Sequence, residues 1–238
     1  MTHLDNELKT LKSSVISMWL LVISQLEKTQ KSIIEHDKEL AQEIKINEKR
    51  VDAFELKLNM DCENILALYN PLAIDLRLIL AILKIDYNLE RIGDYAYSIA
   101  LYSINKEYSF NKKLLKEMQL VNMFGITINM LNDALRAFEN DNANSVRSVY
   151  QLDGDLDNMA DKAEGILINW LQDNPKEARE ILMLSSILKK LERLGDHTKN
   201  IATEIIFHTE AKMLHHTKKK KILKELDKDF EENENKTT

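Results

Sequence analysis

The chain of 238 residues holds few of the residues that interrupt helices or cross-link a fold. It has one cysteine, two prolines and five glycines. A single cysteine excludes an internal disulfide and suits a reducing compartment. The scarcity of proline and glycine favours long, uninterrupted helices.

Long apolar runs are also missing. The longest, around residues 18–23, is far shorter than the roughly 20 residues that a membrane-spanning helix needs. The first residues are polar and acidic, unlike a signal peptide. A net charge of −6 argues against a broad surface for nucleic acid. We therefore expect a cytoplasmic protein that does not bind nucleic acid.

Apolar residues recur along most of the chain with the three-four rhythm of amphipathic helices. This rhythm predicts helices at about 8–34, 38–68, 71–103, 113–139, 143–172 and 176–209. Asp37 is expected to cap the second helix, and Pro71 to open the third. Short connections favour antiparallel packing of each set of three. We predict an all-α fold of six long helices that form two repeated antiparallel three-helix bundles.

An internal repeat sets the domain division. Leu89-Glu-Arg-Ile-Gly-Asp94 returns 102 positions later as Leu191-Glu-Arg-Leu-Gly-Asp196. Earlier in each half the shift is 105, which places Met18-Trp19 on Met123-Phe124. The chain thus reads as two copies of one unit. We assign residues 1–107 to the first bundle, 108–210 to the second, and 211–238 to a charged tail that we expect to be disordered.

Each half carries two acidic pairs spaced four residues apart, at matching places. Residues at this spacing share one face of a helix, so their carboxylates repel each other unless a cation lies between them. The second and third helices have arms of nearly equal length on either side of Pro71, so their pairs should lie level. We therefore predict one metal site per half, with the ligands Glu48, Asp52, Glu90 and Asp94 in the first and Asp153, Asp157, Glu192 and Asp196 in the second.

The residues around these pairs refine the prediction. Gly93 should permit close approach of a neighbouring backbone. Arg91 follows Glu90 directly, and because adjacent helical residues point about 100° apart it should not face that carboxylate. Glu55 and Asp86 lie near the pairs but have no acidic counterpart in the repeat, so they are left out of the predicted sites.

Enzyme signatures are absent from the sequence. It has no Gly-x-x-x-x-Gly-Lys loop, no His-Glu-x-x-His, no Gly-x-Ser-x-Gly, and no Glu-x-x-His of the di-iron bundles. This favours a metal-carrying regulatory adaptor that is not an enzyme. A carboxylate-metal enzyme, such as an oxidase or a phosphohydrolase, is the alternative. A purely structural bundle would not need duplicated acidic pairs.

The segment Tyr69-Asn-Pro-Leu-Ala-Ile-Asp-Leu-Arg77, followed by Leu89-Glu-Arg-Ile-Gly-Asp94, resembles the PhoU family. The second Glu-Arg-Leu-Gly-Asp motif and the duplication strengthen this resemblance, which extends over about residues 5–210. The second half departs from the pattern, because Pro175-Lys-Glu-Ala-Arg179 replaces the longer segment.

The resemblance implies a role in bacterial phosphate homeostasis. PhoU-like proteins restrain the phosphate-sensing histidine kinase, act at the phosphate ABC transporter, and bind metal clusters through acidic motifs. We therefore expect a negative regulator of phosphate uptake and phosphate-starvation signalling. We also expect a homodimer that reaches the membrane only peripherally, through its partners, with the Lys218–Lys221 run as a minor electrostatic aid.

The metal's identity stays open at this point. Ligands that are all carboxylate oxygens suit Mg²⁺, Ca²⁺, Mn²⁺ or iron better than they suit a cysteine-rich zinc site. Iron, manganese, magnesium and zinc are the candidate ions.

Overall fold

The structure is a computed structural model in which residues 2–212 and 222 are described. Seven α-helices and two short 3₁₀ helices follow one another in this part of the chain, with no strand: α1 (His3–Glu35), α2 (Lys38–Tyr69), α3 (Ile74–Asn105), α4 (Lys112–Glu117), α5 (Leu120–Glu139), η1 (Ala143–Val146), α6 (Arg147–Asp173), η2 (Pro175–Glu177) and α7 (Ala178–Glu210). The predicted all-α fold of six long helices is confirmed. The predicted tail, with its Lys218–Lys221 run, lies almost wholly outside the described residues.

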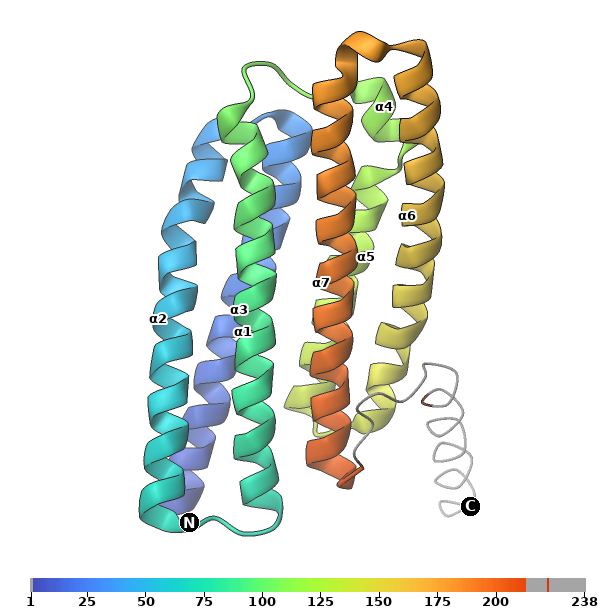
Figure 1. Cartoon of the computed structure of the whole chain (residues 1–238). Coiled ribbons are helices and arrows are strands. Elements are labelled where there is room, and N and C mark those ends of the chain that lie inside the picture. The colour runs from blue at the N-terminus through green and yellow to red at the C-terminus, as the bar shows by residue number, and fades with distance from the viewer. Residues whose placement is uncertain (1, 213–221, 223–238) are drawn as a thin grey trace.

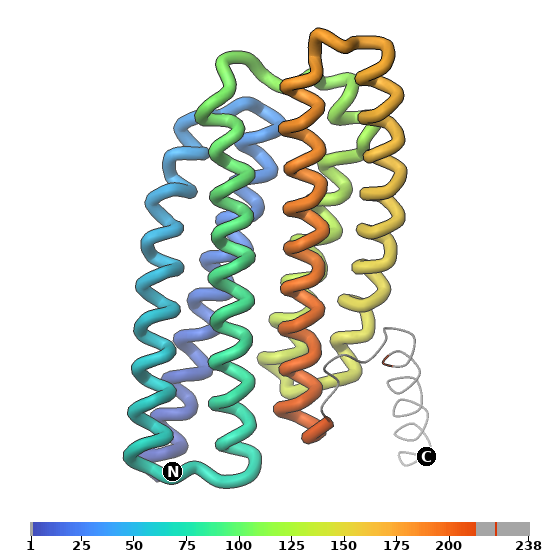
Figure 2. Tube along the Cα trace, in the orientation of Figure 1, coloured from blue at the N-terminus to red at the C-terminus, as the bar shows by residue number. Residues whose placement is uncertain are grey.

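Each half is an antiparallel bundle of three long helices, as predicted. Helices α1 to α3 form one bundle, and α5 to α7, with α4 above them, form the other (Figure 1). The two bundles stand side by side, with α3 and α7 between them (Figure 2). One continuous apolar core runs through both halves. Trp19 of α1 and Phe138 of α5 meet across it, with ring centroids 5.9 Å apart.

Local capping explains where the first helices begin. The hydroxyl of Thr2 accepts from the Asp5 backbone N–H while the Asp5 carboxylate accepts from that of Thr2, a capping box that starts α1. The Asp37 side chain accepts from the Leu40 N–H at 2.9 Å and starts α2, as predicted. Between these helices, His36 turns the chain in the left-handed conformation at φ 56°.

Two predicted helix boundaries are wrong. Pro71 does not open the third helix, because Ala73 has a φ of 50° and α3 begins only at Ile74. The predicted helix over 113–139 is broken in two, since Gln119 adopts a φ of 54° between α4 and α5. No glycine marks either left-handed residue, so the sequence contained no signal for these turns.

The described residues include no helix that is both long enough and apolar enough to span a bilayer. The surfaces of the long helices are mixed, with apolar stripes facing the core and charged residues outward. This arrangement places the acidic pairs on α2, α3, α6 and α7, close to where the helices of each bundle cross.

Candidate metal centre

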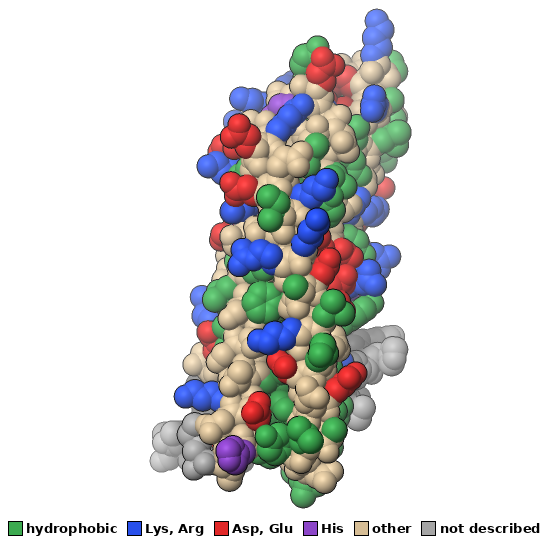
Figure 3. Space-filling model, turned by 90° about the vertical axis from the view of Figure 1, so that its left-hand side faces the viewer, with side chains coloured by type: hydrophobic (Ala, Val, Ile, Leu, Met, Phe, Trp, Pro, Cys, Tyr) green, Lys and Arg blue, Asp and Glu red, His purple; other side chains and the backbone are tan. Residues whose placement is uncertain are grey.

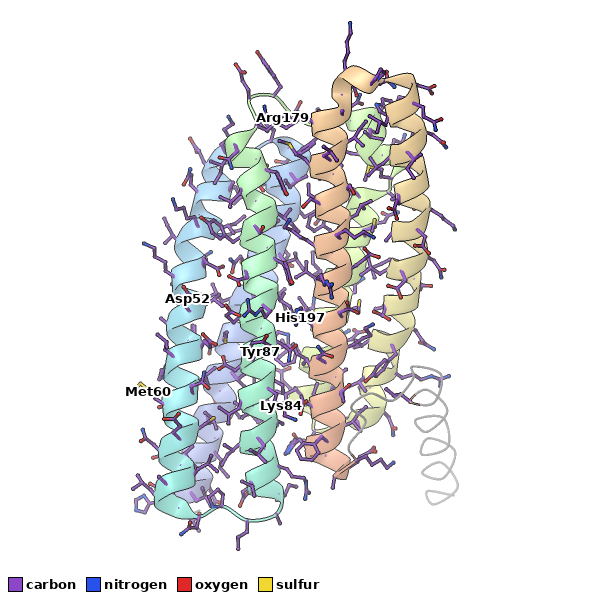
Figure 4. All side chains as sticks on the ribbon, viewed as in Figure 1. Asp52, Met60, Lys84, Tyr87, Arg179 and His197 are labelled. Carbon is purple, nitrogen blue, oxygen red and sulfur yellow. The ribbon has the colours of Figure 1, made fainter. Side chains whose placement is uncertain are left out.

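The first acidic cluster forms where α2 and α3 cross closely. A Cβ atom added at Gly93 would lie 3.3 Å from Val51 Cγ1 and 3.7 Å from Glu48 Oε2. Gly93 therefore permits the close approach expected of it, and it sets the Glu48 carboxylate beside the pair on α3. The prediction that the two pairs lie level across the hairpin is consistent with this contact. Figure 4 labels Asp52 on α2 and Tyr87 on the neighbouring α3.

Glu48 is the buried member of the cluster, with 8% of its surface exposed. The Gln25 amide donates to Glu48 Oε2 at 2.8 Å, while Oε1 is buried without a hydrogen-bond partner. Burial raises the pKa of Glu48 to about 8; Gln25 opposes this shift, and the Asp94 and Asp52 carboxylates add to it. An oxygen that lacks a partner beside two further carboxylates is a group that a cation would satisfy.

Glu90 and Asp94 lie further toward the surface. Their side chains are 16% and 43% exposed. Burial, followed by repulsion from Asp94, raises the pKa of Glu90 to about 7, although the Arg91 charge lowers it. Arg91 Nε lies 3.5 Å from Glu90 Oε2, and its Nη1 lies 3.4 Å from Asp94 Oδ2. The expectation that Arg91 would not face Glu90 is wrong, because its long side chain bends back over the outer side of the pair.

The second acidic cluster contains an internal cation. Lys199 Nζ lies 3.0 Å from Asp153 Oδ1 and 2.9 Å from Asp196 Oδ1. Burial tends to lower the pKa of Lys199, but its hydrogen bonds to these two carboxylates outweigh burial and raise it. Glu192 lies 3.2 Å from Lys189. The exposed Asp157 stands one turn beyond Asp153 on α6.

Close packing at Gly195 repeats the crossing seen at Gly93. A Cβ there would meet Leu156 Cδ2 at 2.9 Å and Asp153 Oδ1 at 3.6 Å. Asp153 thus lies level with the acidic pair of α7. The two halves share the same close helix packing but differ in the basic side chains that pair with the carboxylates.

One acidic group that the sequence prediction left out is fully buried. Asp86 has no exposed surface; its Oδ2 accepts from Asn59 at 3.1 Å and its Oδ1 has no hydrogen-bond partner. Burial, with repulsion from Glu55 and Glu90, raises the pKa of Asp86 to about 8. The repeat-equivalent residue is Leu188, so an acid on an otherwise apolar stripe was the signal available in the sequence.

The carboxylates of the two clusters differ in how well they fit a metal ion. Among residues 2–212 and 222, no three His, Cys, Asp or Glu side chains are placed so that they could hold one. In the first half the chemistry nevertheless fits, because Glu48 offers an oxygen without a partner, Asp52 is exposed one turn further along α2, and the half-exposed Asp94 is held only by a 3.4 Å contact with Arg91. In the second half, Lys199 already stands between Asp153 and Asp196.

Comparisons with known proteins agree with this duplicated architecture. The PhoU domain matches the chain twice, at residues 15–102 and 120–205. The phosphate-specific transport system accessory protein PhoU homolog 1 of Thermotoga maritima is 31% identical over 208 residues, which cover 86% of this chain and 88% of that protein. The PhoU homolog of Pseudomonas putida is 33% identical over 203 residues, covering 84% of this chain and 78% of its own.

Solved structures show the same fold. The crystal structure of PhoU from Pseudomonas aeruginosa superposes with a TM-score of 0.79 at 29% identity, covering 87% of this chain and 99% of that one. The phosphate transport system regulatory protein PhoU from Streptococcus pneumoniae gives 0.80 at 25% identity, covering 89% and 99%. With two domain matches across most of its length and relatives more than 30% identical, this chain belongs to the PhoU family.

Proposed function

We propose that this protein is a metal-binding regulatory adaptor that restrains phosphate uptake and phosphate-starvation signalling. The two PhoU domain matches carry the proposal, since relatives that share them are named accessory proteins of the phosphate-specific transport system. The absence of enzyme motifs from the sequence agrees with action by binding rather than catalysis.

A deletion strain tests the regulatory role. We expect a phosphate-starvation promoter fused to a reporter to be active in high phosphate without this protein, and silent again when the wild-type gene is restored. A deletion strain that keeps the promoter silent and its phosphate uptake normal would contradict the proposal. The carboxylate-metal enzyme would then become the better explanation.

The proposed metal ligands are Glu48, Asp52, Glu90 and Asp94 in the first half and Asp153, Asp157, Glu192 and Asp196 in the second. A bound cation would neutralise carboxylates that now repel one another, and so would fix α2 against α3 and α6 against α7. The candidate ions remain iron, manganese, magnesium and zinc. In the first half, the buried Glu48 oxygen without a partner supports this assignment most directly.

Elemental analysis of the purified chain tests the metal assignment. We expect bound metal in the wild type and less in the variant Glu90→Ala with Asp94→Ala. Glu39→Ala with Glu43→Ala is the matched control, because these residues form an exposed acidic pair at the same spacing on α2. Equal metal content in all three proteins would refute the assignment.

The proposed partners are the phosphate-sensing histidine kinase and subunits of the phosphate ABC transporter, which would bring the protein to the membrane from the cytoplasm. Two rigid bundles standing side by side offer long helical faces for such partners (Figure 1). Affinity capture from phosphate-replete cells, followed by mass spectrometry, should recover both. Capture of neither partner, under conditions in which the tagged protein complements the deletion, would count against direct binding.

A homodimer is part of the proposal, and the outer face of α2 is the surface we assign to it. Exposed apolar residues recur there at spacings of seven, three, four and seven positions, the pattern of a helix that packs against another helix. These residues are Ile46, Ala53, Leu56, Met60 and Ala67. Figure 3, which faces this side of the molecule, shows hydrophobic side chains among charged ones.

Charge complementarity favours a second copy as the occupant of this face. Lys45, Lys49 and Arg50 lie along the first half of the α2 stripe, whereas the second half holds Asp61 and Glu63 together with one basic residue, Lys57. An antiparallel copy would set basic residues against acidic ones on both sides of the twofold axis.

Light scattering tests this interface and should show a dimer for the wild type. Leu56→Glu with Met60→Glu should convert the dimer to a monomer, while Leu182→Glu, at another exposed leucine, should leave the dimer intact.

A further inference from the structure

The two acidic clusters share a frame but differ in the cations placed inside it. Positions 87 and 97 of the first half hold Tyr87 and Tyr97, whereas the equivalent positions of the second half hold Lys189 and Lys199. Each half also keeps one arginine beside its third-helix pair. Among the described residues, the candidate carboxylates are paired with Arg91 in the first half and with Lys189, Arg193 and Lys199 in the second.

Among the basic residues of the second cluster, Lys199 lies deepest, because it contacts the buried Asp153. Its side chain is 26% exposed, and its ammonium group bridges Asp196 on its own helix, α7, and Asp153, which is 2% exposed, on the neighbouring helix α6. It thus joins α6 to α7 in the same way that a bound cation would. In the first half, Tyr97 instead packs against the small apolar cluster of Ala41, Ile44 and Ala100, away from any such role.

The first half supplies only a neutral donor to its buried carboxylate. Gln25 donates to Glu48 Oε2 at 2.8 Å, and Oε1 stays buried without a partner. The equivalent of Gln25 in the second half is Met130, which offers no hydrogen-bond donor. The two buried carboxylates therefore have different donors: an amide reaches one oxygen of Glu48, whereas an ammonium group reaches Asp153.

We propose that Lys199 is a built-in competitor for metal at the second cluster, so that the first cluster binds a divalent cation at least tenfold more tightly. The proposal rests on the metal-binding role proposed above. A cation entering the second cluster must break both ion pairs of Lys199, one of them with a buried carboxylate, and must leave an ammonium group beside it. A cation entering the first cluster meets only the longer contacts of Arg91, whose 43% exposed guanidinium lies 3.4–3.5 Å from Glu90 and Asp94 on its own helix and can swing out to solvent. The two halves would then fill at different metal concentrations.

Titration of the metal-free full chain with Mn²⁺ tests this ranking, with unbound Mn²⁺ counted by electron paramagnetic resonance. We expect two classes of site separated by at least tenfold in affinity. Glu90→Ala with Asp94→Ala should abolish the tight class, and Glu192→Ala with Asp196→Ala the weak one. Lys199→Met should tighten the weak class at least tenfold, and Lys162→Met, an exposed lysine on α6, should change neither.

A converse variant covers the case in which Lys199→Met folds poorly. Tyr97→Lys places the competing charge in the first half and should weaken the tight class while leaving the weak class unchanged. If all sites bind Mn²⁺ with equal affinity, or if neither Lys199→Met nor Tyr97→Lys changes the affinity of either class, Lys199 does not compete with metal. Either result would leave the proposed metal-binding role intact. No Mn²⁺ binding by any of these proteins, with the other candidate metals equally inert, would overturn both.

Discussion

Tyr95 and His197 hold the same position in the two repeats, and their rings face each other with centroids 5.7 Å apart. A contact between equivalent residues lies on the pseudo-twofold axis that relates the bundles, as it would in a symmetric dimer. Figure 4 shows His197 between α3 and α7, the two helices that meet along this axis.

Each α3–α7 contact away from this axis has a symmetry-related counterpart, and the two contacts of such a set can differ in residue type. Lys84 of α3 lies 3.2 Å from Glu204 of α7, and the symmetry-related contact is the hydrogen bond that Tyr102 donates to Ser186 at 2.8 Å. The first contact is an ion pair, whereas the second is a hydrogen bond between two hydroxyl groups with a lysine beside it, because Lys190 Nζ donates to Ser186 Oγ at 2.7 Å.

Substitutions in the Lys84–Glu204 ion pair should lower stability more than substitutions in the Tyr102–Ser186 pair. Glu204 is 2% exposed, so Lys84→Met leaves a buried carboxylate without its nearest cation, and we expect a loss of about 1–3 kcal/mol in unfolding free energy. The double variant Lys84→Ser with Glu204→Tyr copies the Ser186 and Tyr102 hydroxyl groups, with Asn88 in place of Lys190, and should recover part of that loss. Urea denaturation measures both; a double variant no more stable than Lys84→Met would show that the two sides are not interchangeable.

The glycines at the helix crossings should respond to alanine differently from those in open positions. Nothing lies within 4 Å of a Cβ added at Gly165, so Gly165→Ala should stabilise the protein by about 0.5–1 kcal/mol through helix propensity. At Gly195 the new methyl group would meet Leu156 at 2.9 Å, and we expect this gain to be lost or reversed. Thermal unfolding of Gly165→Ala and Gly195→Ala measures both effects. An equal gain in stability in the two variants would contradict the close packing of α6 and α7 at Gly195.

Asp86 should make stability fall as pH rises. Its pKa is about 8 when folded against 3.8 as an ordinary aspartate, so between these values the folded chain keeps a proton that the unfolded chain has lost. Unfolding free energy measured in chelator should therefore decrease from pH 4 to pH 8. Asp86→Leu, which copies Leu188, should reduce this dependence to the part that Glu48 and Glu90 contribute, and should add about 2–4 kcal/mol at pH 8. A wild-type profile that rises over this interval would contradict the assignment.

Glu180 should anchor the connection between the bundles. Its carboxylate accepts from the Asn111 backbone N–H and pairs with Lys106 at 2.9 Å, both partners lying in the linker between α3 and α4. Glu180→Ala should expose the linker to limited proteolysis and lower stability by about 1–2 kcal/mol. Glu164→Ala, at an exposed acid on α6, serves as the control and should be cleaved like the wild type.

Much of the fold followed from the sequence alone. The three-four rhythm of apolar residues and the rarity of proline and glycine determine long amphipathic helices, and the short connections make them antiparallel. The repeat and the equal arms on either side of Pro71 predicted level acidic pairs on α2 and α3, and the contact at Gly93 agrees with this for Glu48. These are local properties or simple consequences of helix geometry, which is why they could be read in advance.

The tertiary structure decided how those carboxylates are balanced. Arg91 bends back to Glu90, Lys199 bridges Asp153 and Asp196, and Asp86 is sealed in the core. Residue spacing fixes the face on which a Cβ lies, but the reach of a long side chain depends on the neighbouring helix, and burial depends on what packs above it. The left-handed turns at Ala73 and Gln119 were likewise set by packing, because neither residue type prefers that conformation by itself.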